Sequence, residues 1–203
     1  MSTLDRAEVE VLPPEALAIL EYNKERMKAN RLENLKKGVI MLNEIFTPLV
    51  MERILDELDA AAGDRNVDVI TLRINSNGGD CSALMPMVDW IERCPKPVRT
   101  VVQGKAYSCG AMLLMSGTKG QRIASKRSSI LIHEVSNDYG YAKASQHHEN
   151  AEHIKYVNEQ LIEMIKAKTK MKPAEISRYM HSNLDIFISP EMALKYGIID
   201  KIL

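Results

Sequence analysis

Three residues of this chain, Ser108, His133 and Asp185, supply the side-chain types that nucleophilic acyl transfer needs. A serine hydroxyl can attack a carbonyl, an imidazole can take the hydroxyl proton, and a carboxylate can orient the imidazole. Each residue also has a structural alternative. The serine could pack among small residues, the histidine could be a satisfied strand-end residue, and the aspartate could bond only to backbone.

Ser108 lies within the stretch VVQGKAYSCGAMLLMSG at residues 101–117. A β-branched run, a break and then a run of small residues, Met and Leu predict a strand, a tight turn and a buried helix. The turn would lift the hydroxyl out of the sheet. The helix N-terminus behind it would offer unpaired N–H groups and a partial positive charge to a developing oxyanion.

The pair Gly78–Gly79 follows an apolar, β-branched strand expected at residues 67–75. In parallel sheets chemistry gathers at the carboxyl ends of strands, so we expect this pair and Ser108 to be neighbours. Two glycines allow positive φ and close backbone approach, and one could present its N–H to an oxyanion. An ordinary tight turn is the alternative. Phosphate binding is not favoured, because neither a GxGxxG nor a Walker-type loop is present.

His133 ends an apolar strand, and Asp185 stands between apolar neighbours. A carboxylate in such a setting needs a hydrogen-bond partner, which could be backbone or His133. The order Ser–His–Asp along the chain disfavours the α/β-hydrolases, whose order is Ser–Asp–His. The remaining histidines do not follow the HExxH metal spacing, and the cysteines show no CxxC pair, so no metal site is expected.

The elements that must position these residues alternate between strands and helices, which predicts an α/β domain with a largely parallel sheet. Residues 1–13 are expected to be flexible and 15–37 to form one or two exposed helices that pack on the domain or on another subunit. Strands are expected at 39–43, 67–75 and 98–103, a helix at 48–62, a hairpin from 121–124 and 128–132, a long helix at 143–168, a short helix at 190–196 and a last strand at 198–203.

The composition is that of a soluble globular protein. Among 203 residues, 27 Lys and Arg balance 27 Asp and Glu, so the formal net charge is zero. This balance argues against a global nucleic-acid or membrane-surface binder and favours self-association. The acidic N-terminus lacks a secretory pattern, no stretch is long enough to span a membrane, and three cysteines indicate reduced thiols. We expect a cytoplasmic protein.

Five motifs over residues 38–203 resemble the ClpP family, the proteolytic subunits of Clp proteases. They are Ile74-Asn75-Ser76 with Gly78-Gly79, Gly104-x-Ala106-x-Ser108-x-Gly110-Ala111, Ile132-His133, Asp185-x-Phe187-x-Ser189, and Tyr196-Gly197 with Asp200. The resemblance implies a crotonase-like α/β spiral and a serine endopeptidase that cleaves unfolded polypeptides through an acyl-enzyme.

The same resemblance implies roles for individual residues. Ser108 would be the nucleophile, His133 the general base and Asp185 its orienting carboxylate. The oxyanion hole would come from the backbone N–H groups of Gly79 and Cys109. The substrate strand would pair with two segments, one containing Gly78, Gly79 and Asp80 and the other containing Glu134 and Val135.

The resemblance also implies an assembly. Residues 143–168 would form a handle helix between two stacked heptameric rings, a tetradecamer. An AAA+ unfoldase would supply substrate using ATP, whereas the peptidase itself would need no metal or organic cofactor. Residues 38–203 would be the peptidase domain, and residues 1–37 a flexible and helical extension that the family motifs do not cover.

Several positions depart from the family pattern. Asn77 stands where proline is usual, Cys109 where methionine is common, and Glu134-Val135 where Gln-Pro is usual. An oxyanion contribution through the Cys109 backbone is indifferent to its side chain. The divergence also resembles phage-encoded ClpP-like proteins, for which capsid maturation in the host cytoplasm is an alternative role. A non-catalytic scaffold subunit and a crotonase-type enzyme acting on acyl-CoA thioesters are further alternatives.

Overall fold

Seven strands form a single, mostly parallel sheet in the computed structural model, which describes residues 13–136, 143–182 and 185–203. The sheet order is β1-β2-β3-β4-β7, and β5 pairs with β3 and β6. The strands are β1 (Val39–Leu42), β2 (Ile70–Ser76), β3 (Val98–Tyr107), β4 (Arg122–Ala124), β5 (Ser129–Ile132), β6 (Ile186–Ile188) and β7 (Lys201–Ile202). The helices are α2 (Pro14–Lys36), α3 (Pro48–Gly63), α4 (Cys81–Arg93), α5 (Cys109–Ser116), α6 (Ala144–Lys168), α7 (Pro173–Met180) and α8 (Pro190–Tyr196). This architecture confirms the expected α/β class.

The strand at the centre of the sheet is β3. It pairs in parallel with β2 along one edge, and on the other edge it pairs with β4 near Thr100 and with β5 near Ala106. The sequence-based expectation of a hairpin at 121–124 and 128–132 is therefore wrong. Because β3 is ten residues long, β4 and β5 can both lie beside it, one after the other and in the same direction.

Local sequence explains where the helices begin and what they bury. Thr47 caps α3, since its hydroxyl accepts a hydrogen bond from the Val50 N–H at 3.2 Å. Helix α4 buries one apolar face in the core, next to α3 and α5, and every residue of α5 is buried. The core formed in this way fixes the ends of β2 and β3, from which Gly78–Gly79 and Ser108 emerge.

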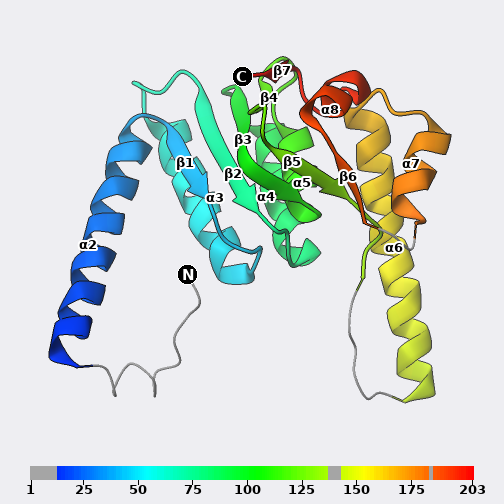
Figure 1. Cartoon of the computed structure of the whole chain (residues 1–203), viewed down its shortest axis with the longest axis horizontal. Coiled ribbons are helices and arrows are strands. Elements are labelled where there is room, and N and C mark those ends of the chain that lie inside the picture. Colours follow the sequence, from blue (N-terminus) through cyan, green and yellow to red (C-terminus); the bar gives the residue numbers. More distant parts are fainter. Residues whose placement is uncertain (1–12, 137–142, 183–184) are drawn as a thin grey trace.

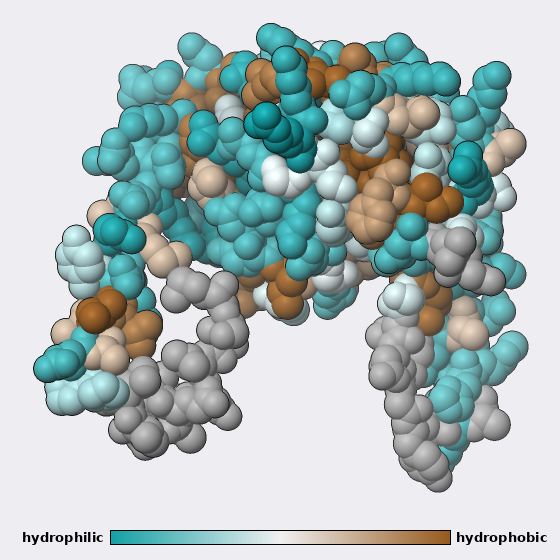
Figure 2. Space-filling view, in the orientation of Figure 1, coloured by the Kyte–Doolittle hydropathy of each residue, from teal (hydrophilic) through white to brown (hydrophobic). Residues whose placement is uncertain are grey.

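Two helices extend away from the sheet on opposite sides of the molecule, α2 and the N-terminal part of α6 (Figure 1). Residues 14–36 form one helix, and none of them is fully buried. Leu35 near its C-terminal end packs against the core of the domain, and packing on another subunit stays a prediction. Other apolar side chains of α2 lie among polar ones on the surface (Figure 2). Near its C-terminal end Arg31 pairs with the Glu57 carboxylate of α3 at 3.4 Å. The expectation for residues 1–12 lies outside the described residues.

Among the described residues, no helix combines the length and the apolar character needed to cross a membrane.

An ion pair joins the partly buried Asp200 to the buried Arg122 of the sheet. The Arg122 guanidinium of β4 contacts both Asp200 carboxylate oxygens, at 2.9 and 2.7 Å, and also donates to the Lys168 carbonyl of α6. Burial acts to raise the pKa of Asp200, but the hydrogen bonds and charge of Arg122 outweigh it and hold that pKa below its ordinary value. Asp200 therefore contributes stability in its ionised form.

We predict that Asp200→Asn lowers the free energy of unfolding by about 3 kcal/mol at neutral pH, because Arg122 stays buried without its counter-charge. A lowered folded-state pKa contributes stability that is present above the unfolded-state pKa and lost as the pH falls through the folded-state value. The free energies of unfolding of Asp200→Asn and of the unsubstituted chain, measured in urea, should therefore become more alike as the pH falls. The exposed Asp68→Asn is the control, with an expected change within about 0.5 kcal/mol. A pH-independent difference would contradict the assignment.

Candidate active site

Ser108 occupies a strained turn between β3 and α5. Its backbone has φ 53° and ψ −121°, and it is the only non-glycine residue with positive φ among those that the structure describes. Its N–H donates to the Leu131 carbonyl of β5 at 2.9 Å, and its own carbonyl accepts from Ala111 in α5. Strand and helix together hold this conformation, whose strain costs on the order of 1–3 kcal/mol. The hydroxyl does not cap the helix.

The Gly78–Gly79 loop lies directly against this turn. A Cβ on Gly78 would sit 2.7 Å from the Ser108 Cβ and 3.2 Å from the Cys109 nitrogen. The loop is fixed from behind by Phe46, whose N–H donates to the Gly78 carbonyl and whose carbonyl accepts from the Asp80 N–H. Both glycines have positive φ, at 93° and 140°. The close approach of loop and turn therefore requires glycine.

Two backbone N–H groups border Ser108. Cys109 is the first residue of α5, and the N–H groups of a first helical turn have no partner within their helix. The N–H of Gly79 has no backbone or side-chain acceptor among the described residues. The Gly79 carbonyl accepts from the Cys109 thiol at 3.2 Å, which ties the two residues together. The arrangement can provide two donors and a helix N-terminus to an oxyanion on a group bound at Ser108.

His133 and Asp185 are brought together by the antiparallel pairing of β5 with β6. Ile132 pairs with Ile186, so the next residues outward are His133 and Asp185. The His133 Nδ1 lies 3.4 Å from the Asp185 Oδ1, and the two side chains are 27% and 60% exposed. The apolar sequence around Asp185 had suggested an apolar setting. The carboxylate is in fact exposed, because alternate residues of a strand end face solvent.

Ser108 and His133 line one cavity of about 280 Å³, together with Gly79, Cys81 and Leu161. Both residues belong to the described part of the chain, and no hydrogen bond joins the Ser108 hydroxyl to the imidazole there. Catalytic hydrogen bonds commonly tighten only when substrate binds. The cavity is thus lined by a serine hydroxyl, by an imidazole that faces a carboxylate and by Gly79, and the Cys109 N–H adjoins the serine.

The segment after His133 is held by a residue that sequence reasoning missed. The buried Asn158 of α6 accepts a hydrogen bond from the Val135 N–H at 3.2 Å, while Glu134 is exposed. Asn158 follows Ile154 by four residues and so falls on the apolar stripe of the helix. A polar residue on that stripe could have indicated a buried hydrogen bond, because a buried amide side chain needs hydrogen-bond partners.

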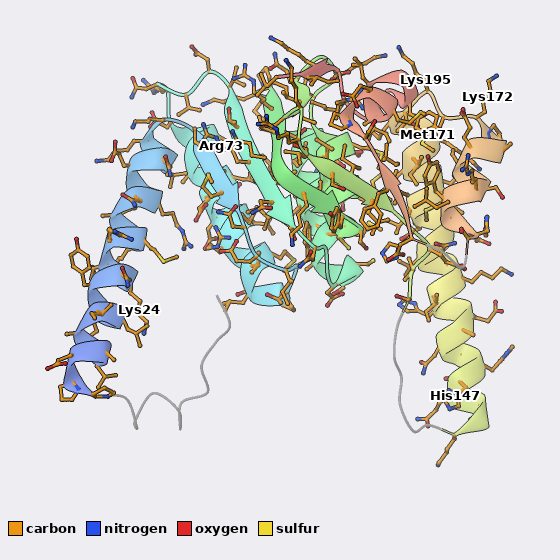
Figure 3. The ribbon with its side chains drawn as sticks, in the orientation of Figure 1. Lys24, Arg73, His147, Met171, Lys172 and Lys195 are labelled. Carbon is orange, nitrogen blue, oxygen red and sulfur yellow. The ribbon has the colours of Figure 1, made fainter. Side chains whose placement is uncertain are left out.

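On the other side of the site, Asp80 caps α4 by accepting from the Ser82 N–H at 2.7 Å. A second cavity of about 550 Å³ lies between this turn, residues 135–136 and α6, with His153 on its wall. His147, by contrast, lies near the outer end of α6 (Figure 3). In the part of the chain that the structure describes, no group of three or more His, Cys, Asp or Glu side chains could hold a metal ion.

Comparison with known proteins extends these observations. The family model described as Clp protease matches residues 23–203. This chain belongs to the Clp protease family. The match begins within α2 and covers all of the strands and helices that follow it.

Curated relatives agree with the Clp protease assignment. The chain is 35% identical over 170 residues to ATP-dependent Clp protease proteolytic subunit 2 of Thermobifida fusca, which is 83% of this chain and 82% of that protein. It is 34% identical to subunit 1 of Bifidobacterium longum, over 69% of this chain and 59% of that protein. It is also 37% identical to subunit 1 of Thermobifida fusca, over 66% of this chain and 60% of that protein. The resemblance to the ClpP family is confirmed.

We predict that Gly78→Ala destabilises the chain by about 2 kcal/mol or more, because the new methyl group would meet Ser108 and the Tyr107 carbonyl at 2.7 Å. Urea unfolding measures the change. Gly63→Ala is the matched control: a Cβ there meets nothing within 4 Å. Since Gly63 lies in the last turn of α3, its replacement should be neutral or stabilising by up to about 1 kcal/mol. Equal effects of the two substitutions would contradict the close packing of loop and turn.

Proposed function

We propose that this Clp protease family member is a serine endopeptidase that hydrolyses unfolded polypeptides through an acyl-enzyme. One observation carries the proposal: Ser108, held in a strained turn, shares a cavity with His133, whose Nδ1 lies 3.4 Å from the Asp185 carboxylate. The proteolytic activity named in the relatives supports it.

In the proposed reaction the Ser108 oxygen attacks the carbonyl carbon of the peptide bond while His133 takes the hydroxyl proton. The N–H groups of Gly79 and Cys109 then bind the negative oxygen of the tetrahedral intermediate. His133 returns the proton to the leaving amine, which departs and leaves an ester on Ser108. A water molecule, deprotonated by the same imidazole, attacks the ester and releases the acid. Asp185 orients the imidazole and stabilises its protonated form.

We further propose that the substrate lies as an extended strand along Gly78, Gly79 and Asp80, with Glu134 and Val135 on its other side. The Val135 N–H already donates to Asn158, so pairing on that side would use the other backbone groups of the segment. No metal or organic cofactor takes part in the proposed reaction.

The proposed assembly is a cytoplasmic ring or double ring of heptamers, fed by an AAA+ unfoldase that consumes ATP. The term ATP-dependent in the relatives' names supports such a partner, and the projecting helix α6 (Figure 1) supports contact between rings. In this proposal residues 38–203 are the peptidase domain and residues 1–37 an extension.

We predict that a fluorophosphonate probe modifies Ser108 stoichiometrically in assembled protein, because the reagent requires an activated serine beside an oxyanion site. Intact and peptide-level mass spectrometry identifies the adduct. Ser108→Ala should assemble normally, lose the adduct and lose nearly all peptide hydrolysis. Full activity of Ser108→Ala would disprove the proposal. Assembled protein that takes no adduct, alone or with its unfoldase, would identify a scaffold subunit, and acyl-CoA binding would identify a crotonase-type enzyme.

We predict that Asp185→Asn slows labelling and peptide hydrolysis by roughly 10²–10⁴-fold, since the amide cannot stabilise a protonated imidazole. Asp68→Asn again serves as the control, and the folded state is checked by urea unfolding. An unchanged rate in Asp185→Asn would remove Asp185 from the mechanism.

A further inference from the structure

Two thiols that the proposed reaction does not use lie in contact beside Ser108. The Sγ atoms of Cys81 and Cys109 are 3.6 Å apart. The two cysteines are the first residues of α4 and α5, so both helix N-termini meet at this point. A disulfide has an S–S distance of about 2.05 Å, and the two sulfurs would need to approach by only roughly 1.5 Å.

The two thiols differ in access. Cys109 is buried, whereas Cys81 is half-buried and lines both the cavity that contains Ser108 and the larger cavity next to α6. A small reagent can therefore reach Cys81 through the same space that a substrate would use. Cys109 lines neither of these cavities.

The two thiols also differ in acidity. The hydrogen bond with Cys109 lowers the pKa of Cys81, against the opposing effects of burial and of the neighbouring Asp80. The same contact and then burial raise the pKa of Cys109 well above its ordinary value. The thiolate is the reactive form of cysteine, and both position and acidity thus make Cys81 the attacking group and Cys109 the resolving thiol.

We propose that Cys81 and Cys109 form a reversible oxidation site for hydroperoxides, and that its closure lowers the reactivity of Ser108. The Cys81 thiolate attacks one oxygen of hydrogen peroxide and the O–O bond breaks, so that Cys81 becomes a sulfenic acid. The departing hydroxide takes up the proton that Cys81 had released to solvent and leaves as water. The Cys109 sulfur then attacks the Cys81 sulfur, loses its proton and expels a second water. Both sulfurs are oxidised, one hydrogen peroxide is reduced to two waters, and an external thiol reverses the step.

Formation of the Cys81–Cys109 disulfide would alter the proposed oxyanion hole. This part of the inference rests on the proposed function. In the reduced form the Cys109 thiol donates to the Gly79 carbonyl at 3.2 Å. A disulfide has no thiol proton, so this hydrogen bond is lost and the Cys109 sulfur moves toward Cys81. The two N–H groups proposed to bind the oxyanion belong to Gly79 and Cys109. A change in their relative placement weakens transition-state binding.

The experiment treats the full-length protein with hydrogen peroxide, alkylates the remaining thiols, digests it and maps disulfides by mass spectrometry. We expect a Cys81–Cys109 linked peptide, lighter by two hydrogen atoms than the sum of its reduced parts and restored by dithiothreitol. Cys81→Ser should abolish the link. Cys94→Ser is the matched control, since Cys94 lies at the other end of α4 and should leave the link intact. Oxidation of Cys81 to sulfinic acid, or a link between chains, without the internal disulfide would overturn the proposal.

A second readout follows the rate at which the fluorophosphonate probe labels Ser108 in reduced and oxidised protein. Oxidation should slow labelling on the order of tenfold or more in the unsubstituted chain and in Cys94→Ser. In Cys81→Ser the ratio of the two rates should stay near one. If protein with the Cys81–Cys109 disulfide is labelled as fast as reduced protein, the proposal that the disulfide lowers Ser108 reactivity is wrong. If the reduced protein takes no probe, the proposed function fails, while the disulfide map still decides whether the oxidation site exists.

Discussion

The pairing of β3 with β5 is the constraint on which the site depends. Tyr107 pairs with Leu131, and the next N–H along the chain, that of Ser108, donates to the Leu131 carbonyl. Leu131 is two residues before His133 in the chain. This main-chain hydrogen bond therefore brings Ser108 close to His133 without any side-chain contact. The helix N-terminus of α5 then holds the serine in a conformation that a strand alone would not keep.

A second backbone pairing completes the arrangement. Strand β5 lies between β3, which it joins in parallel, and β6, which it joins in antiparallel register. The register with β6 sets Asp185 opposite His133, and the parallel pairing sets His133 beside the serine turn. Three chemically useful side chains, far apart in sequence, are therefore brought together mainly by main-chain hydrogen bonds. Substitutions that disturb these strand ends should act on the site as a unit.

Much of this arrangement could be predicted from sequence, because it rests on local patterns. The apolar spacing of α3 and α4, the Thr47 cap and the strand–turn–helix around Ser108 were all predictable. The partners of β4 and β5 could not be predicted. Two short apolar runs have the same sequence pattern whether they pair with each other in a hairpin or both pair with one long strand. The exposure of Asp185 and the Cys81–Cys109 contact likewise depend on non-local packing, which neighbouring residues do not encode.

The glycine loop and the start of α5 are held more rigidly than the His133 and Asp185 side chains. On the side proposed to bind the oxyanion, Phe46 fixes the glycine loop through two main-chain hydrogen bonds, and a helix fixes the Cys109 N–H. On the side proposed to transfer protons, the His133 Nδ1 lies 3.4 Å from the Asp185 Oδ1, and the Asp185 side chain is 60% exposed, so water screens its charge. The hydrogen bonds of His133 can shorten when substrate excludes water. The N–H groups proposed to bind the oxyanion depend on a fixed position and cannot easily compensate if they are displaced. The disulfide proposed at Cys109 would therefore act on the side of the site that has less freedom to adjust.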